Sequence, residues 1–137
     1  MVRIETVYQG GLRVEATHVP SGTSLLTDAP VDNHGRGESF SPTDLVATAL
    51  GSCMATIMGI VAERHGVDLS GMRVTVVKHM VTTPERRIGK LVTVIHVPME
   101  PEEPLRRALE LAARACPVHR SLRADLETPV TFRWGRA

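Results

Sequence analysis

The hydropathy pattern of the chain is dominated by an uncharged stretch that covers residues 45–62. Ser41 stands where a helix N-cap is expected, and Asp44, three residues later, completes a capping-box pattern. At the other end, Gly66 suits the left-handed conformation that terminates helices. The stretch therefore predicts one helix over residues 42–65. Because this helix is apolar on nearly every side, we expect it to be buried inside the protein.

Before this helix, apolar and polar residues alternate as they do in half-buried strands. The alternation covers residues 2–8 and 12–17, and the two glycines at 10–11 between them predict a hairpin turn. A short third strand is predicted at 23–27. Residues 28–40 form a polar segment with two glycines, which predicts a loop that leads directly into the helix.

After the helix, the pattern changes back to alternation. Residues 67–81 and 90–97 predict an antiparallel strand pair joined by a polar connection at 82–89. Apolar residues then recur at helical spacing over 105–116, with charged residues on the opposite face. A last strand is predicted at 130–134.

The predicted element order is βββ–α–ββ–α–β, without internal repeats. This order indicates an α+β fold in which helices pack on antiparallel sheet, in a single domain over residues 1–137. A helix of this length without a polar face needs cover on all sides, which so short a chain can hardly supply. We therefore expect an intimate homodimer, in which a second subunit completes the burial.

Composition argues against several classes of partner. The net charge is only +1 and the aromatic residues are one Tyr, one Trp and two Phe, so we expect no nucleic acid partner. The uncharged stretch is rich in small residues, which favours a buried helix over a membrane span. Arg3 and Glu5 interrupt the first residues, so no signal peptide is expected. With two cysteines forming no disulfide framework, we expect a cytoplasmic protein.

The two cysteines, Cys53 and Cys116, are open to two interpretations. Free cysteines are among the most buried residues, so both could be small core side chains. Both also lie on buried faces of different predicted helices and could meet across the core. Pro117 either ends the second helix or opens another turn, and a thiol at a helix start has a lowered pKa. A cysteine pair that meets can pass through sulfenic acid to a disulfide.

Other chemistry has weaker support in the sequence. Six histidines show no close metal-ligand spacing, and two isolated cysteines are too few for a zinc site. Cys116 and His119, three residues apart, could form a thiol–imidazole pair or part of a metal site, although a polar helix residue is the simpler interpretation of His119. No glycine-rich nucleotide motif is present. We therefore expect neither a metal nor a bound cofactor.

Two segments resemble motifs of a known family. Residues 41–53, SPTDLVATALGSC, resemble the peroxidatic-cysteine helix of the OsmC/Ohr family, and residues 115–122, ACPVHRSL, resemble its second-cysteine motif. The motifs stand in the family's order, with a strand pair between them and a strand after them. The resemblance extends over nearly the whole chain and favours the redox interpretation of the two cysteines.

The resemblance implies a thiol-dependent peroxidase that reduces organic, and also inorganic, hydroperoxides in oxidative-stress defence. Cys53 would attack the peroxide, and Cys116 would resolve the sulfenic acid as a disulfide. An external thiol or dithiol, such as a lipoylated protein, would then reduce the pair. The family fold is an intertwined homodimer with the long helices at its centre and active sites at the subunit interface.

The chain also departs from the family pattern. Characterised peroxidases of the family carry a glutamate after the helix-opening proline, where this chain has Thr43, with an acid one position later at Asp44. This indicates a divergent subgroup. The family also uses an arginine to hold the thiolate. Arg36 in the loop matches best, and Arg13 in the second strand is the alternative.

Two further functions fit the same sequence. A non-catalytic dimer could bind a small apolar ligand, with the cysteines only packing in the core. A redox sensor could change its dimer when Cys53 is oxidised. A lowered thiol pKa at Cys53 would favour the enzyme, and turnover in excess reductant would separate the enzyme from the sensor.

Overall fold

A computed structural model describes residues 1–136 of the chain. The chain divides into two compact units, Met1–Val46 and Ala47–Ala137, each of which is described by itself. The single-domain assignment stays a prediction. The α+β class is confirmed by two three-stranded sheets with few helices.

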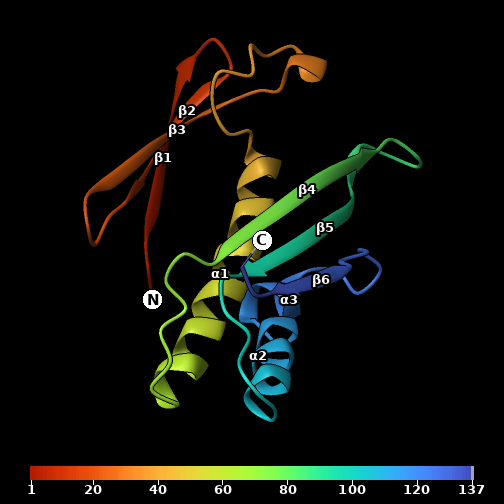
Figure 1. Cartoon of the computed structure of the whole chain (residues 1–137). Coiled ribbons are helices and arrows are strands. Elements are labelled where there is room, and N and C mark those ends of the chain that lie inside the picture. Colours follow the sequence, from red (N-terminus) through yellow and green to blue (C-terminus); the bar gives the residue numbers. More distant parts are fainter. Residues whose placement is uncertain (137) are drawn as a thin grey trace. The chain divides into compact units, whose positions relative to one another are not determined.

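The first unit contains an antiparallel meander in the order β1-β2-β3 (Figure 1). Its strands are β1 (Ile4–Gly10), β2 (Arg13–His18) and β3 (Thr23–Asp28), as the alternation predicted. Positive φ angles at Gly10, Gly11 and Leu12 build the first hairpin turn. The segment after β3 is a loop with one short 3-10 turn at Val31–Asn33. The strand and loop predictions for this unit are confirmed, with β1 lying two residues later than the predicted 2–8.

Helix α1 (Pro42–Arg64) begins and ends where the sequence predicted. The Ser41 N–H donates to Asp44 Oδ2 at 2.8 Å, and the Asp44 N–H donates to Ser41 Oγ at 3.1 Å, which completes the capping box. At the other end Gly66 has φ +67°, and the N–H of Val67 bonds to the carbonyl of Ala62 at 2.9 Å. This is a Schellman stop, which satisfies carbonyls of the last helical turn.

The second unit contains a mixed sheet in the order β4-β5-β6. Strands β4 (Arg73–Val81) and β5 (Arg87–Val97) pair antiparallel, as predicted. Strand β6 (Val130–Trp134), however, pairs parallel with β5, so the expected all-antiparallel sheet is wrong in this detail. The long connection over residues 98–129 has the length and the helices of a crossover, which returns the chain in the same direction.

Two strand boundaries also differ from prediction. β4 begins at Arg73, because residues 67–72 form a turn in which Asp68 Oδ1 accepts from the N–H and hydroxyl of Ser70 and Gly71 has φ +90°. β5 begins at Arg87, inside the predicted connection. Hydropathy alternation did not distinguish these turn residues from strand.

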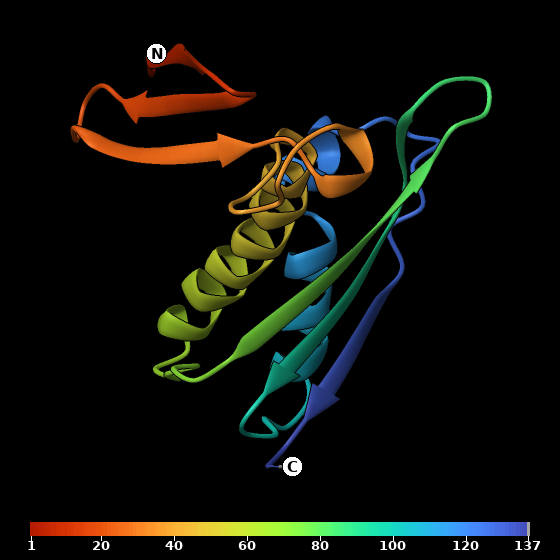
Figure 2. The same cartoon turned by 90° about the horizontal axis from the view of Figure 1, so that it is seen from above.

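Two further helices complete the second unit: α2 (Leu105–Arg114) and the one-turn α3 (Pro117–Ser121). Figure 2 shows α1 and α2 on the same side of the sheet. The core of this unit is formed by side chains of both helices and of β5. The members without solvent exposure include Leu50, Met54 and Met58 of α1, Leu91 and Ile95 of β5, and Leu109 of α2. The expectation of helices packed on sheet is confirmed for this unit.

Within this single chain α1 is buried along one face, not all round. The buried face approaches β4 closely at Gly51, where an added Cβ would lie 3.0 Å from Val76 Cγ2 and 3.3 Å from Val74 Cγ1. Among residues 1–136, α1 is the one helix long and apolar enough to cross a membrane. Length and composition are weak evidence for a membrane span, because the core helix of a soluble protein meets the same criteria. The packing of α1 on β4 favours a core helix.

Candidate functional site

The second unit brings Cys53 and Cys116 together. Cys53 lies in the middle of α1 and is half-buried, whereas Cys116 lies between α2 and α3 and has no exposed surface. The side chains are close enough to interact, since Cys53 influences the ionisation of Cys116 by hydrogen bonding and by charge. Both cysteines are free thiols. The suggestion that they meet across the core is therefore confirmed.

Local structure fixes the position of Cys116. Cys116 has an extended backbone and is the N-cap of α3, and Pro117 occupies the first turn of that helix. Its Sγ accepts a hydrogen bond from the backbone N–H of His119 at 3.3 Å. Of the two outcomes left open for Pro117, the structure thus shows the new helical turn. The sulfur takes the position that a serine or aspartate oxygen commonly occupies.

The environment of Cys116 favours its protonated form. Burial is the largest influence and raises the pKa of the Cys116 thiol, and the interaction with Cys53 raises the pKa further. The N–H groups of His119 and Val118 act in the opposite direction, because they stabilise a thiolate. The balance leaves Cys116 as a thiol at neutral pH, facing the other sulfur.

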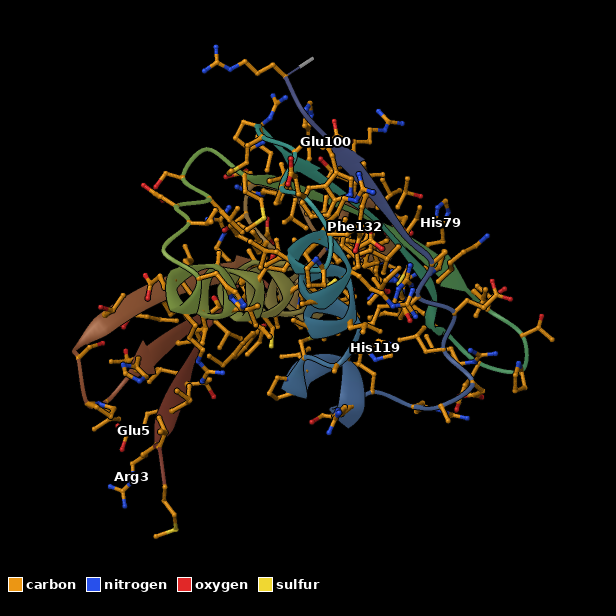
Figure 3. The ribbon with its side chains drawn as sticks, turned by 60° about the horizontal axis from the view of Figure 1, so that its bottom comes forward. Arg3, Glu5, His79, Glu100, His119 and Phe132 are labelled. Carbon is orange, nitrogen blue, oxygen red and sulfur yellow. The ribbon has the colours of Figure 1, made fainter. Side chains whose placement is uncertain are left out.

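The His119 side chain is turned to a different partner. Its Nε2 lies 2.9 Å from Thr128 Oγ1, in the segment that leads into β6. Figure 3 labels His119 among the side chains. Its contact with Cys116 is made through the backbone, so the structure shows no thiol–imidazole pair in which the ring takes part. Across residues 1–136 no group of three or more His, Cys, Asp or Glu side chains could hold a metal ion.

The two candidate arginines both belong to the first unit, and their surroundings differ. The Arg36 side chain is 81% exposed, with Glu38 Oε1 at 4.0 Å. The Arg13 side chain is 27% exposed, and its Nη2 donates to Glu38 Oε2 at 2.6 Å and lies 3.7 Å from Asp28 Oδ2. Their role toward the thiols of the second unit stays a prediction.

Sequence reasoning missed Asp28 as the anchor of the loop before α1. Asp28 is 1% exposed, and its Oδ2 accepts from the N–H of Glu38 at 3.1 Å. This hydrogen bond is the main reason that the pKa of Asp28 lies below its ordinary value, with Arg13 adding to the effect and burial opposing it. A single acid at the end of a strand carries no sequence signal for such a role. The same holds for Thr128 beside His119.

Comparison with known proteins identifies the family. Residues 35–131 match the family model of the OsmC-like proteins, a range that includes both cysteine motifs. No curated protein matches the chain. Among solved structures, a protein of Psychrobacter arcticus 273-4 is 40% identical with a TM-score of 0.91, and the alignment covers 96% of each chain. Its name refers to osmotic stress induction and a detoxification response.

More distant structures share the fold. An organic hydroperoxide resistance protein of Legionella pneumophila is 19% identical with a TM-score of 0.75, over 97% of this chain and 96% of that one. One from Bacillus subtilis is 14% identical with a TM-score of 0.71, over 97% and 98%. The chain therefore belongs to the OsmC-like protein family, which includes organic hydroperoxide resistance proteins.

Proposed function

We propose that this protein is a thiol-dependent peroxidase that reduces organic hydroperoxides, with inorganic peroxide as a further substrate. The observation that carries the proposal is the pairing of the two cysteine thiols, one half-buried and one fully buried, inside one unit of the fold. Two cysteines that only filled space would have no need to meet. Membership of a family that includes organic hydroperoxide resistance proteins supports the same reaction.

The chemistry follows from the positions of the two sulfurs. Cys53, the more accessible sulfur, attacks the terminal peroxide oxygen as a thiolate and becomes a sulfenic acid, while the alcohol departs. The thiol of Cys116 then condenses with the sulfenic acid, which gives a disulfide and one molecule of water. Because Cys116 is held protonated, it does not compete for peroxide. An external dithiol, such as a lipoylated protein, returns the pair to thiols, without a bound cofactor or metal.

A cation near the Cys53 thiolate would assist the first step, because burial alone disfavours a charged sulfur. We assign this role to Arg36, with Arg13 as the alternative. The exposed Arg36 has the freedom to serve a reacting thiolate, whereas Arg13 is already engaged by two acids. Replacing each arginine by Gln and measuring the pH profile of Cys53 alkylation in a Cys116→Ser background separates the two. The catalytic arginine is the one whose loss moves the profile to higher pH.

We further propose that the protein acts as a cytoplasmic homodimer, without membrane or nucleic acid partners. All seven residues of β1 are exposed, and Ile4, Val7 and Tyr8 are each more than half exposed. Apolar side chains exposed on both faces of a strand are unfavourable in water, and in the proposed dimer a second copy of the chain buries them. Sedimentation equilibrium should give twice the chain mass of 14.9 kDa.

The experiment that tests the peroxidase is consumption of cumene hydroperoxide by the pure protein with dithiothreitol. Wild type should turn over repeatedly, and Cys53→Ser should be inactive. Cys116→Ser should react once and then stop as a sulfenic acid or a more oxidised product. Ser52→Ala, at the exposed neighbouring position, is the matched control and should retain full activity.

The outcomes also separate the other functions. If wild type is as inactive as Cys53→Ser, the peroxidase proposal fails, and binding of a small apolar ligand becomes the function to test. If Cys53 oxidises once and is not recycled in excess dithiol, the protein is a sensor. Neither alternative has a structural observation of its own in its favour.

A further inference from the structure

The two sulfurs of the cysteine pair differ in how an external thiol can reach them. Within the single chain, Cys53 keeps part of its surface exposed, and Cys116 keeps none. Thiol–disulfide exchange needs an in-line approach of the attacking thiolate to one sulfur, while the other sulfur leaves. Within the single chain, access therefore favours Cys53 as the sulfur that is attacked.

We propose that the reductant attacks Cys53 of the disulfide, so that the mixed disulfide forms on Cys53, and that the turn Pro117–Ser121 holds Cys116 as the leaving sulfur. This inference rests on the proposed function, because it concerns the reduction half of that cycle. It assigns positioning roles to His119 and Thr128, which take no part in the reaction with peroxide.

Attack on Cys53 makes Cys116 the leaving sulfur, which is unfavourable because Cys116 is buried. A sulfur that leaves inside an apolar core must carry negative charge at the moment of exchange, and burial opposes that charge. The N–H of His119 points at Cys116 Sγ from 3.3 Å, and the Val118 N–H adds a weaker contribution. These donors stabilise the developing thiolate and offset part of the penalty.

Once released, Cys116 takes up a proton, because its environment raises the pKa of the thiol. A thiol is a weaker nucleophile than a thiolate, so the return attack of Cys116 on the mixed disulfide is slowed. The mixed disulfide on Cys53 therefore persists long enough for the second thiol of a dithiol to attack it.

The turn that supplies the donors is short and needs an anchor. The bond between His119 Nε2 and Thr128 Oγ1, at 2.9 Å, ties α3 to the segment before β6. That segment is itself held to β5, since the N–H of Leu91 donates to the carbonyl of Glu127 and the N–H of Thr93 to the carbonyl of Pro129, both at 2.9 Å. Thr128 thus anchors the turn that carries the His119 N–H.

The exchange balances in atoms and electrons. One thiolate of the dithiol forms a bond to Cys53 Sγ, and the Cys53–Cys116 bond breaks with its electron pair on Cys116 Sγ, which is then protonated. The second thiol of the reductant loses its proton and attacks the reductant sulfur of the mixed disulfide, which expels the Cys53 thiolate. The dithiol is oxidised by two electrons, and the protein disulfide is reduced by two.

The first test maps the attacked sulfur without any peroxide. The wild-type disulfide is formed with diamide, treated briefly with one equivalent of glutathione, and quenched with acid and N-ethylmaleimide. Trypsin places Cys53 in the fragment 37–64 and Cys116 in the fragment 115–120, so mass spectrometry reads the two sites separately. We expect glutathione on 37–64 and N-ethylmaleimide on 115–120.

The alternative results are distinct. Glutathione on 115–120, or equally on both fragments, overturns the inference. If diamide forms no disulfide within the chain, the inference and the proposed resolving step fall together. If the mapping succeeds but cumene hydroperoxide is not consumed, only the peroxidase proposal fails, and the direction of exchange stands.

The second test addresses the anchor. Thr128→Val should slow reduction of the disulfide by dithiothreitol roughly two- to tenfold, the range expected for one net hydrogen bond, and leave the single-turnover oxidation by cumene hydroperoxide unchanged. Thr128→Ser, which keeps the hydroxyl, should restore the rate. Thr131→Val, at an exposed position of β6, is the matched control. Equal slowing of both half-reactions, or no rescue by serine, would show a merely structural role and overturn the assignment.

Discussion

Each of the two units is stabilised internally by a different kind of interaction. Among residues 1–136, every buried apolar side chain lies at or after Ala47. The buried side chains of the first unit are Thr27, Asp28 and Ser41, all of them polar. The second unit therefore has an apolar core of its own, whereas the first is ordered by hydrogen bonds and ion pairs around the loop before α1.

The difference has consequences for stability. Apolar burial contributes in proportion to area and depends little on pH, whereas a buried carboxylate contributes only while it is ionised and held by hydrogen bonds or opposite charge. A small unit without a core is marginal by itself. This agrees with the proposal that a second subunit covers the first unit. Substitutions in the two units should then differ in size and in pH dependence.

The largest effect is expected in the core of the second unit, from Leu109→Ala in α2. Leu109 has no exposed surface, so its truncation leaves a cavity and should lower the free energy of unfolding by about 2–5 kcal/mol. Leu111→Ala is the matched control in the same helix, because Leu111 is 55% exposed and should cost less than about 0.5 kcal/mol. Urea unfolding measures both. Equal losses would contradict the placement of the core.

A smaller effect is expected where α1 packs on β4. Gly51→Ala brings a methyl group against Val74 and Val76 and should destabilise the protein by about 1–3 kcal/mol through overpacking. Gly59 lies in the same helix with open space around its Cα, so Gly59→Ala should instead stabilise by up to about 1 kcal/mol through helix propensity. Thermal unfolding followed by circular dichroism distinguishes the two. Stabilisation by both substitutions would rule out the close packing.

The smallest effect is expected in the first unit and depends on pH. The pKa of Asp28 is lowered in the folded chain, chiefly by the Glu38 N–H and further by Arg13, so its ionised form contributes stability. That contribution is fully present above the ordinary value of 3.8 and is lost as the pH falls below it through the lowered folded pKa. The stability difference between wild type and Asp28→Asn should therefore be greatest at neutral pH and shrink in acid.

Arg13 lowers the pKa of Asp28 less than the Glu38 N–H does, so an Arg13 variant is a control for Asp28→Asn. Arg13→Gln removes the lesser contribution and leaves the Glu38 N–H in place, so it should flatten the pH dependence less than Asp28→Asn. Urea unfolding over a pH series measures both variants. A constant difference between wild type and Asp28→Asn at every pH would contradict the role given to this carboxylate.

The sequence predicted best where a local pattern decides the structure. The capping box at Ser41 and Asp44, the stop at Gly66 and the extent of β6 are all confirmed, because each depends on residues close in sequence or on simple alternation. The meeting of Cys53 and Cys116 was predicted too, from the apolar stripes of two predicted helices, although the second helix ends at Arg114 and Cys116 lies just after it.

The parts that escaped prediction depend on long-range contacts. Alternation is the same in parallel and antiparallel strands, so the direction of β6 beside β5 was not encoded in the pattern. Which face of α1 is buried depends on the segments that pack against it. The same holds for the two arginines, because Arg13 is paired closely with Glu38 whereas Arg36 is largely exposed. Hydropathy alone does not report these neighbours.

The crossover between β5 and β6 also sets the order in which the chain can assemble. β4 and β5 are neighbours in sequence and form a local hairpin, whereas β6 must wait until residues 98–129 have closed a long loop. Cys116 is carried by that loop, and Cys53 precedes both strands. During synthesis, a chain that has emerged only through β5 has one cysteine without its partner. In the proposed cycle, excess oxidant at that stage would carry Cys53 past the reversible sulfenic acid to the irreversible sulfinic acid, because the resolving thiol is not yet in place.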